Sequence, residues 1–273
     1  YNAGVDYSMS NFSDFIGGGG SASFPTFFLH KSATWVPPQD GNIMIHVIGA
    51  GGSGTGSTVD SDVQSGAAGG YCRKNSLAVT TSGSFTVTIG AGGASRIGAA
   101  GAGTAGGTTS VAGTGLGSTL TATGGAGGTV STGSYTTGGV GSNGDLNTNG
   151  GRGGFRKGGG AVGLTGTGND GFFGANSYRT VGANCDILGD FYSSTLGQIS
   201  GGAGGVVYTA SATGCLVEAG ELAGGGSSAA SSIPLAVGHA SIGGGGGWTQ
   251  NGTGADIISG RGGEGCVVIQ YIL

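Results

Sequence analysis

The stretch IMIHVIGAGGSG, from Ile43 to Gly54, combines the two kinds of segment from which this sequence is built. Its first half, Ile43 to Ile48, is rich in β-branched residues and has apolar side chains at alternate positions, which is typical of a β-strand. Its second half, from Gly49, is dominated by glycine and has almost no side chains to pack. The stretch therefore predicts a strand that runs directly into a glycine-rich segment.

The same pattern recurs elsewhere in the chain. SFTVTI, Ser84 to Ile89, also predicts a strand and is followed at once by GAGG. A third strand is predicted for CVVIQYIL, Cys266 to Leu273, and two further candidates are Ser76 to Thr80 and Phe24 to Trp35. No long amphipathic helix is indicated anywhere. Two strands that both lead into glycine clusters indicate a structural junction used more than once.

The composition argues for a packed chain in spite of its glycine content. Glycine supplies 71 of the 273 residues and proline only 4, a composition that by itself suggests disorder. Disordered chains, however, are usually polar and highly charged, whereas this chain is 36% hydrophobic and 8% charged with a net charge of -4. Collagen is excluded because the glycines are clustered and do not fall at every third residue.

Ordered glycine clusters need partners for their backbone groups. Polyglycine-II helices, which have the polyproline-II geometry, meet this need because all their N–H and C=O groups are free to bind neighbouring helices. We therefore predict a mostly irregular protein with some β-structure, in which a small β-region carries a bundle of polyglycine-II helices, with almost no α-helix. The expected division is an attachment or tether segment at 1–34, a β-region of 35–89 with 266–273, and a glycine lattice with loop inserts at 90–265.

One motif resembles a dinucleotide-binding fingerprint. Gly49, Gly51 and Gly54 form GxGxxG after a strand, but a Rossmann unit also requires a helix and an acidic residue about 20 positions later. The residues that follow have no helical periodicity, and Asp60 and Asp62 come too early. We expect these glycines to form a structural junction without nucleotide binding.

No other pattern indicates chemistry. The three histidines are scattered, and the four widely spaced cysteines indicate small buried residues or disulfides more than metal ligands. The 9 Lys and Arg residues give no footprint for nucleic acid, and no apolar run approaches the length needed to cross a membrane. We predict a protein that is not an enzyme, has no cofactor or metal, and neither binds nucleic acid nor inserts into membranes.

Loops carried on a rigid scaffold are where binding residues concentrate. The richest insert runs from Asp170 to Gln198 and gathers aromatic residues and an arginine, the types that dominate interface energetics. The alternative is that these aromatic side chains form a small core that caps the lattice. The candidate receptor-binding residues are Tyr135, Phe172, Phe173, Tyr178, Arg179, Phe191, Tyr192, Tyr208 and Trp248.

Three passages together resemble the glycine-rich domain proteins of tailed bacteriophages. They are WVPPQDGNIMIHVIGAGGSG, AVTTSGSFTVTIGAGG and GRGGEGCVVIQYIL, which follow one another between Trp35 and Leu273. Some tail-fibre tip adhesins of such phages are similar in using a sandwich of polyglycine-II helices with variable loops between the glycine motifs.

The resemblance implies a tail-fibre or tip adhesin on the virion surface. Its partners would be a host surface protein or glycan and other virion fibre proteins. One alternative is a structural fibre, spike or decoration subunit that binds no receptor. Another is an ice-binding protein, since flat bundles of polyproline-II helices can order water, although the irregular inserts argue against it.

Overall fold

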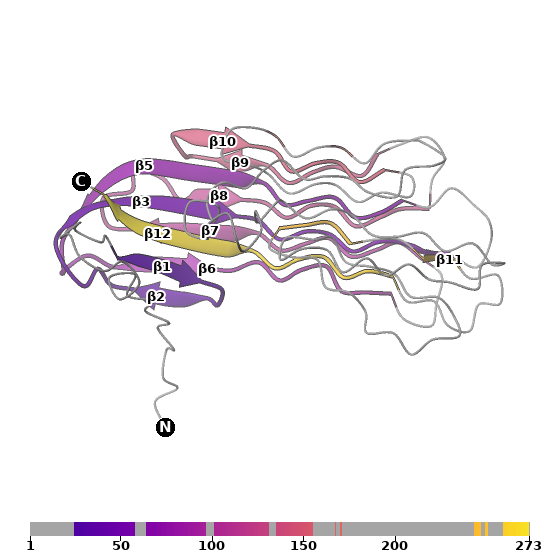
Figure 1. Ribbon diagram of the computed structural model, residues 1–273, viewed down its shortest axis with the longest axis horizontal. Helices are drawn as coiled ribbons and strands as arrows, with labels where there is room; N and C mark the ends of the chain where they lie inside the picture. The colour runs from indigo at the N-terminus through magenta and orange to yellow at the C-terminus, as the bar shows by residue number, and fades with distance from the viewer. Residues whose placement is uncertain are drawn as a thin grey trace, which may run out of the picture.

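The computed structural model consists of two β-sheets at one end, from which glycine-rich segments extend side by side toward the other end (Figure 1). No α-helix is present in the part of the chain that it describes. The predicted fold class is confirmed. The described residues are 25–57, 64–96, 101–130, 135–154, 167, 170, 243–246, 249–250 and 259–272.

The two large sheets have five strands each, and both are antiparallel. The first has the order β1 (Thr26–Leu29), β12 (Cys266–Ile272), β3 (Gly41–Ile48), β5 (Tyr71–Val79) and β10 (Leu146–Thr148). The second has the order β2 (Ala33–Trp35), β6 (Phe85–Thr88), β7 (Thr109–Gly113), β8 (Leu120–Ala122) and β9 (Gly141–Ser142). At the opposite end of the molecule, β4 (Gly56–Ser57) and β11 (Thr249–Gln250) form a short parallel pair.

The strands predicted from alternating apolar residues are all present. β3, β6 and β12 match the three main predictions, and β5 includes most of the stretch Ser76 to Thr80. The stretch Phe24 to Trp35 contains two strands, β1 and β2, which join different sheets by pairing with β12 and β6. β7 to β10 were not predicted because they have only two to five residues each, too few for a clear alternation.

A hydrophobic core lies between the two sheets. Alternation along β3 turns Ile43, Ile45 and Val47 toward this core, where all three are fully buried. The second sheet contributes Trp35 and Phe85, whose ring centroids are 5.6 Å apart. The two sheets thus bury most of the large apolar side chains of the described residues at one end of the molecule.

Two polar side chains, His46 and Tyr71, are buried on the opposite face of the first sheet. The Nδ1 atom of His46 lies 2.9 Å from the Tyr71 hydroxyl. Burial, together with the positive charge of the adjacent Arg73, lowers the pKa of His46 from 6.5 to about 4. The imidazole is therefore neutral in the folded protein at neutral pH.

The glycine segments are joined by backbone hydrogen bonds that repeat every three residues. Segment 49–56 lies at the centre, and its successive amides donate to three neighbouring segments in rotation. This is the repeat of a polyproline-II helix, so the predicted polyglycine-II geometry is present in this segment. Residues 49, 52 and 55 donate to segment 64–70, residues 50, 53 and 56 to segment 101–107, and residues 51 and 54 to segment 260–263.

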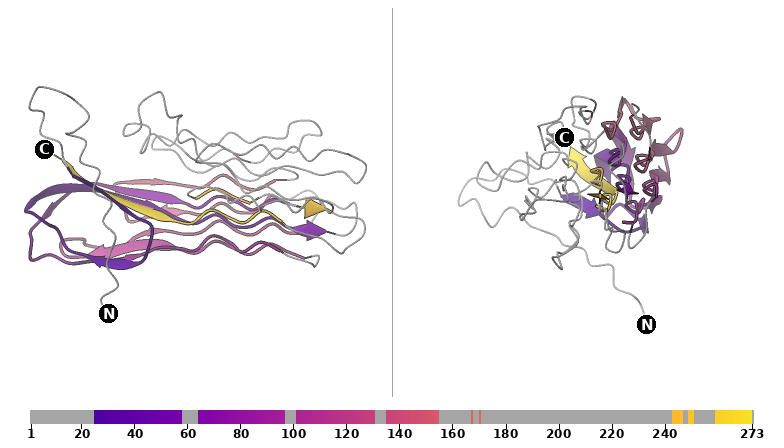
Figure 2. Two further views of the ribbon diagram at one scale, coloured as in Figure 1. Left: turned by 60° about the horizontal axis from the view of Figure 1, so that its bottom comes forward. Right: turned by 90° about the vertical axis from the view of Figure 1, so that its right-hand side faces the viewer.

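The carbonyl groups of the same segment bind three further neighbours. Gly93 donates to Gly51, Gly246 donates to Gly52, and the amide of Gly125 donates to the carbonyl of Ala50, at 2.8 to 2.9 Å. Segment 49–56 is therefore surrounded by six segments, and the view along the bundle in Figure 2 shows the segments beside one another. Such close approach leaves no room for side chains at the contacts.

Strands and glycine segments alternate along the chain. β3 continues into segment 49–56 and β6 into segment 90–96, so the structural junction predicted from the repeated motif is confirmed. Within the GxGxxG motif, the amides of Gly49, Gly51 and Gly54 donate to carbonyls of neighbouring segments at 2.8, 2.8 and 3.1 Å. The lattice was expected to begin at residue 90. Polyglycine segments 49–56 and 64–70 precede that residue, and strands β7 to β10 follow it.

Replacement of a glycine within the lattice should destabilise the fold strongly. A Cβ atom at Gly125 would overlap the backbone carbonyl of Ala67, which is itself held in the lattice, whereas a Cβ atom at Gly117 would meet nothing within 4 Å. We expect Gly125→Ala to reduce the free energy of unfolding by about 1–3 kcal/mol or more, and Gly117→Ala to change it little. Equal melting temperatures for the two variants would contradict the lattice.

A second prediction concerns pH. The unfolded chain protonates His46 near pH 6.5 and the folded chain only near pH 4, so stability is lost as the pH falls through this window. The loss should be on the order of 2–3 kcal/mol. Urea unfolding of the wild type and of His46→Gln at pH 7, 5.5 and 4 isolates this contribution. The difference in free energy of unfolding between the wild type and His46→Gln should shrink with falling pH. A difference that stays constant from pH 7 to pH 4 would refute the lowered pKa of His46.

Candidate functional site

The polyglycine segments end together at the side of the bundle far from the two large sheets, a region called the tip here (Figure 1). Gly56 and Gly101 exchange hydrogen bonds of 3.1 and 2.8 Å there. Further hydrogen bonds near the tip join Gln64 to Thr129, Ser65 to Gly154, and Arg96 to Ser259. The tip is therefore assembled from distant parts of the sequence.

The connections between the segments leave the lattice at the tip. Residues 58–63, 97–100 and 131–134 join consecutive segments there and lie outside the described residues. At the sheet end, connections such as those between β7 and β8 and between β9 and β10 are part of the described structure. Consecutive lattice segments are thus joined alternately at the tip and through the strands at the sheet end.

Of the nine residues predicted to bind a receptor, the structure describes Tyr135. It is half-buried and directly precedes Thr136, which forms an antiparallel bridge with Gly153. The other eight, together with nearly all of the insert that begins at Asp170, lie outside the described residues: Phe172, Phe173, Tyr178, Arg179, Phe191, Tyr192, Tyr208 and Trp248.

Tyr135 belongs to a cluster that the sequence did not reveal. The guanidinium carbon of Arg152 lies 4.6 Å from the centre of the Tyr135 ring, within the range of a cation–π contact. The Arg152 side chain also donates to one carboxylate oxygen of Asp170 from Nε at 2.9 Å and from Nη2 at 2.6 Å. Its backbone amide donates to the other oxygen at 2.8 Å.

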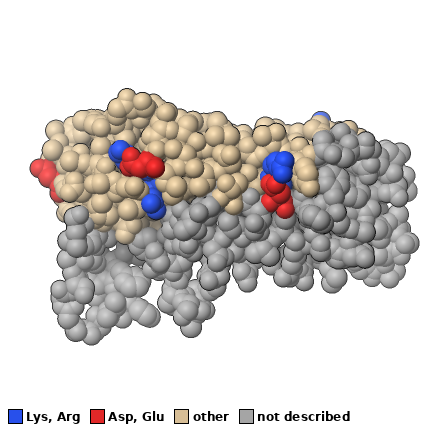
Figure 3. All heavy atoms as spheres, turned by 90° about the horizontal axis from the view of Figure 1, so that it is seen from above, with Lys and Arg blue, Asp and Glu red and all other residues tan. Residues whose placement is uncertain are grey.

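The Arg152–Asp170 pair joins opposite charges at 2.6 Å. Charged side chains are sparse on the described part of the face viewed in Figure 3, and there Lys or Arg lies beside Asp or Glu in two places. Partial burial alone would raise the pKa of Asp170, but the hydrogen bonds and positive charge of Arg152 outweigh it and hold the pKa below its ordinary value. A second pair joins Lys74 to Asp145 at 2.8 Å, and this hydrogen bond lowers the pKa of the Asp145 carboxyl. Both carboxyl groups are therefore ionised at neutral pH.

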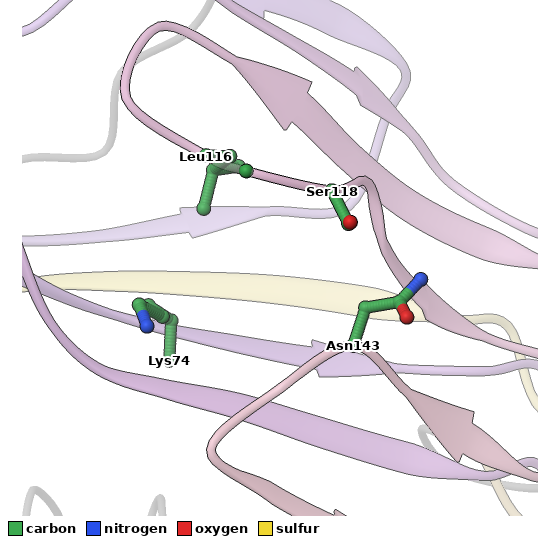
Figure 4. Close-up of a pocket in the computed structure, with 5 residues that line it drawn as sticks. Lys74, Leu116, Ser118 and Asn143 are labelled. Carbon is green, nitrogen blue, oxygen red and sulfur yellow. The ribbon is translucent and has the colours of Figure 1, made fainter.

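A shallow hollow of about 330 Å³ lies at the sheet end, away from the tip. Its lining comes from β5, from the connection between β7 and β8, and from the turn between β9 and β10 (Figure 4). Lys74 donates there to Asp145, and Asn143 donates to the carbonyl of Thr119 at 2.8 Å, so these two donors are engaged within the protein. The hollow therefore presents few polar groups that point to a specific ligand.

The other residues considered from sequence occupy ordinary structural positions where they are described. Cys72 and Cys266 are buried, and burial raises the pKa of the Cys72 thiol to about 11. Within the described ranges no three His, Cys, Asp or Glu side chains are grouped so that they could hold a metal ion. No helix long and apolar enough to span a membrane occurs in those ranges either.

Comparison with protein families gives a match over most of the chain. The family model described as "Glycine-rich domain" matches residues 28–272, from β1 to the end of β12. No curated protein matches the sequence. Since the match covers most of the chain and includes both sheets and the polyglycine segments, the protein belongs to the glycine-rich domain family.

Proposed function

We propose that this protein is a bacteriophage tail-fibre or tip adhesin that binds a host surface protein or glycan through loop inserts displayed on its polyglycine lattice. The observation that carries the proposal is the lattice itself, in which six segments surround segment 49–56 and hold one another by backbone hydrogen bonds. A structure of this kind holds the ends of several loops side by side at fixed spacing. The two sheets close one end of the lattice.

A rigid lattice favours binding by the loops, because ordering a loop on binding costs conformational entropy. Loops whose ends are fixed lose less freedom on binding than loops on a mobile support, so more of the contact energy remains as affinity. The reciprocal hydrogen bonds between Gly56 and Gly101 fix two such ends directly. A glycine lattice can thus give stable support while the inserts differ freely in sequence and length.

The resemblance of three passages to phage glycine-rich proteins supplies the biological setting of the proposal. In that setting the protein acts at the virion surface, together with other fibre proteins, and has no catalytic step. The alternative of a structural virion subunit without a receptor shares the same scaffold. The two differ in whether the isolated chain binds cells.

A second candidate function, ice binding, is favoured by one observation on the side of the bundle. Exposed small side chains recur there every three residues on two adjoining segments, a repeat of about 9 Å along each polyproline-II helix. They are Ala91 and Ala94 on one segment and Ala102, Ala105 and Thr108 on the other. Inhibition of ice recrystallisation by the purified chain would support this function, and its absence would remove it.

Recognition should depend on the insert from Asp170 to Gln198 and not on exposed residues of the sheets. We expect Phe173→Ala to weaken adsorption of the purified chain to a susceptible bacterial strain by on the order of 1–3 kcal/mol, without a change in melting temperature. Phe28→Ala is the matched control, because Phe28 is an exposed aromatic residue on β1.

Two outcomes would overturn this expectation. If the insert aromatics form a core that caps the lattice, Phe173→Ala will lower the melting temperature, and adsorption will fall only in proportion to the unfolded fraction. If the wild-type chain adsorbs to no strain in a broad bacterial panel, the adhesin proposal fails, and the structural virion subunit becomes the better explanation.

A further inference from the structure

Arg152 is held in a fixed position by the lattice. The carbonyls of the residues on either side of it, Gly151 and Gly153, accept hydrogen bonds from Ala68 and Thr136 at 3.0 and 2.8 Å. Both donors belong to segments of the lattice. The backbone at Arg152 therefore cannot shift without breaking lattice hydrogen bonds, although its side chain is half exposed.

Tyr135 is fixed in the same way. The next residue, Thr136, is buried, and its hydroxyl donates to the carbonyls of Ser65 and Gly153 at 3.0 and 3.1 Å. The Tyr135 ring then supports the guanidinium group of Arg152 from one side. This contact orients the planar guanidinium group before any carboxylate binds to it.

Asp170 is the residue that Arg152 binds. It lies 18 positions beyond Arg152 in the sequence, and both of its carboxylate oxygens are bound by Arg152. A single exposed ion pair contributes little, but paired donors on a planar guanidinium with a backbone amide in addition give a defined geometry. The residue at which the aromatic insert begins is thus attached to the side of the lattice.

We propose that Arg152, supported by Tyr135, is a positioning residue that anchors the chain to the lattice at Asp170, the first residue of the candidate recognition insert. Under this proposal Tyr135 contributes to recognition by holding Arg152 and not by contacting the receptor. The proposal rests on the proposed adhesin function for its role in recognition. The attachment of Asp170 itself can be measured without any receptor.

Amide exchange in the whole chain tests the attachment. In Arg152→Gln and Asp170→Asn, peptides that contain residue 170 should exchange about three- to tenfold faster than in the wild type, while lattice peptides stay protected. Arg152→Lys keeps the charge but loses the paired geometry, so its effect should be intermediate. Arg261→Gln is the matched control, because it removes another exposed arginine–carboxylate pair, with Glu264 at 2.8 Å.

Adsorption to cells tests the role in recognition. Arg152→Gln should weaken adsorption about three- to tenfold at an unchanged melting temperature, and Tyr135→Leu should act in the same direction. Unchanged exchange around residue 170 in Arg152→Gln would refute the attachment. Faster exchange with unchanged adsorption would refute the positioning role. If the wild type binds no cells, the adhesin function fails while the exchange result still decides the attachment.

Discussion

Every other feature of this molecule depends on the hydrogen bonds between neighbouring polyglycine segments. A polyproline-II helix has no internal hydrogen bonds, so each of its backbone groups must find a partner outside the segment or remain unpaired. Segment 49–56 solves this by donating to three neighbours and accepting from three others with a three-residue repeat. The solution works only if the backbones approach within hydrogen-bonding distance, and at Gly51, Gly66 and Gly125 an added Cβ would overlap a neighbouring carbonyl. The high glycine content is therefore a steric requirement of the lattice.

The two sheets bring the segments together in the correct register. β3 pairs with β12 so that Ile48 lies opposite Cys266, and just beyond this pair Gly51 donates to Gly263. The antiparallel order of the strands is thus continued by the order of the segments that follow them. A glycine segment alone has little hydrophobic surface and a high entropic cost of ordering, whereas the buried side chains between the sheets supply a favourable term at one end of the bundle. The sandwich and the lattice are consequently parts of one cooperative structure.

This division of roles also bears on the candidate site. The lattice holds the ends of the connections at the tip, and its flank has room for side chains such as those of Tyr135 and Arg152. From the sequence, Tyr135 was a candidate for receptor contact because an aromatic residue in a polar insert is typical of a binding surface. The structure places it against Arg152, an intramolecular partner from a different segment. Only its proximity to Asp170 distinguishes Arg152 from a solvated arginine.

The sequence by itself determined the strands β3, β6 and β12, the absence of an amphipathic helix pattern, and the glycine segments, because these features are encoded in local periodicity and composition. It also indicated the junction between strand and glycine segment, since the same local transition occurs twice. Only the tertiary structure decided which segments are neighbours, because glycine has no side chain to record its partner and the partners are distant in sequence. Arg96 and Ser259, for example, are bonded across 163 residues of chain. The central place of segment 49–56, the gathering of the connections at one tip and the cluster of Tyr135, Arg152 and Asp170 all follow from such long-range pairing, which no local pattern in the sequence encodes.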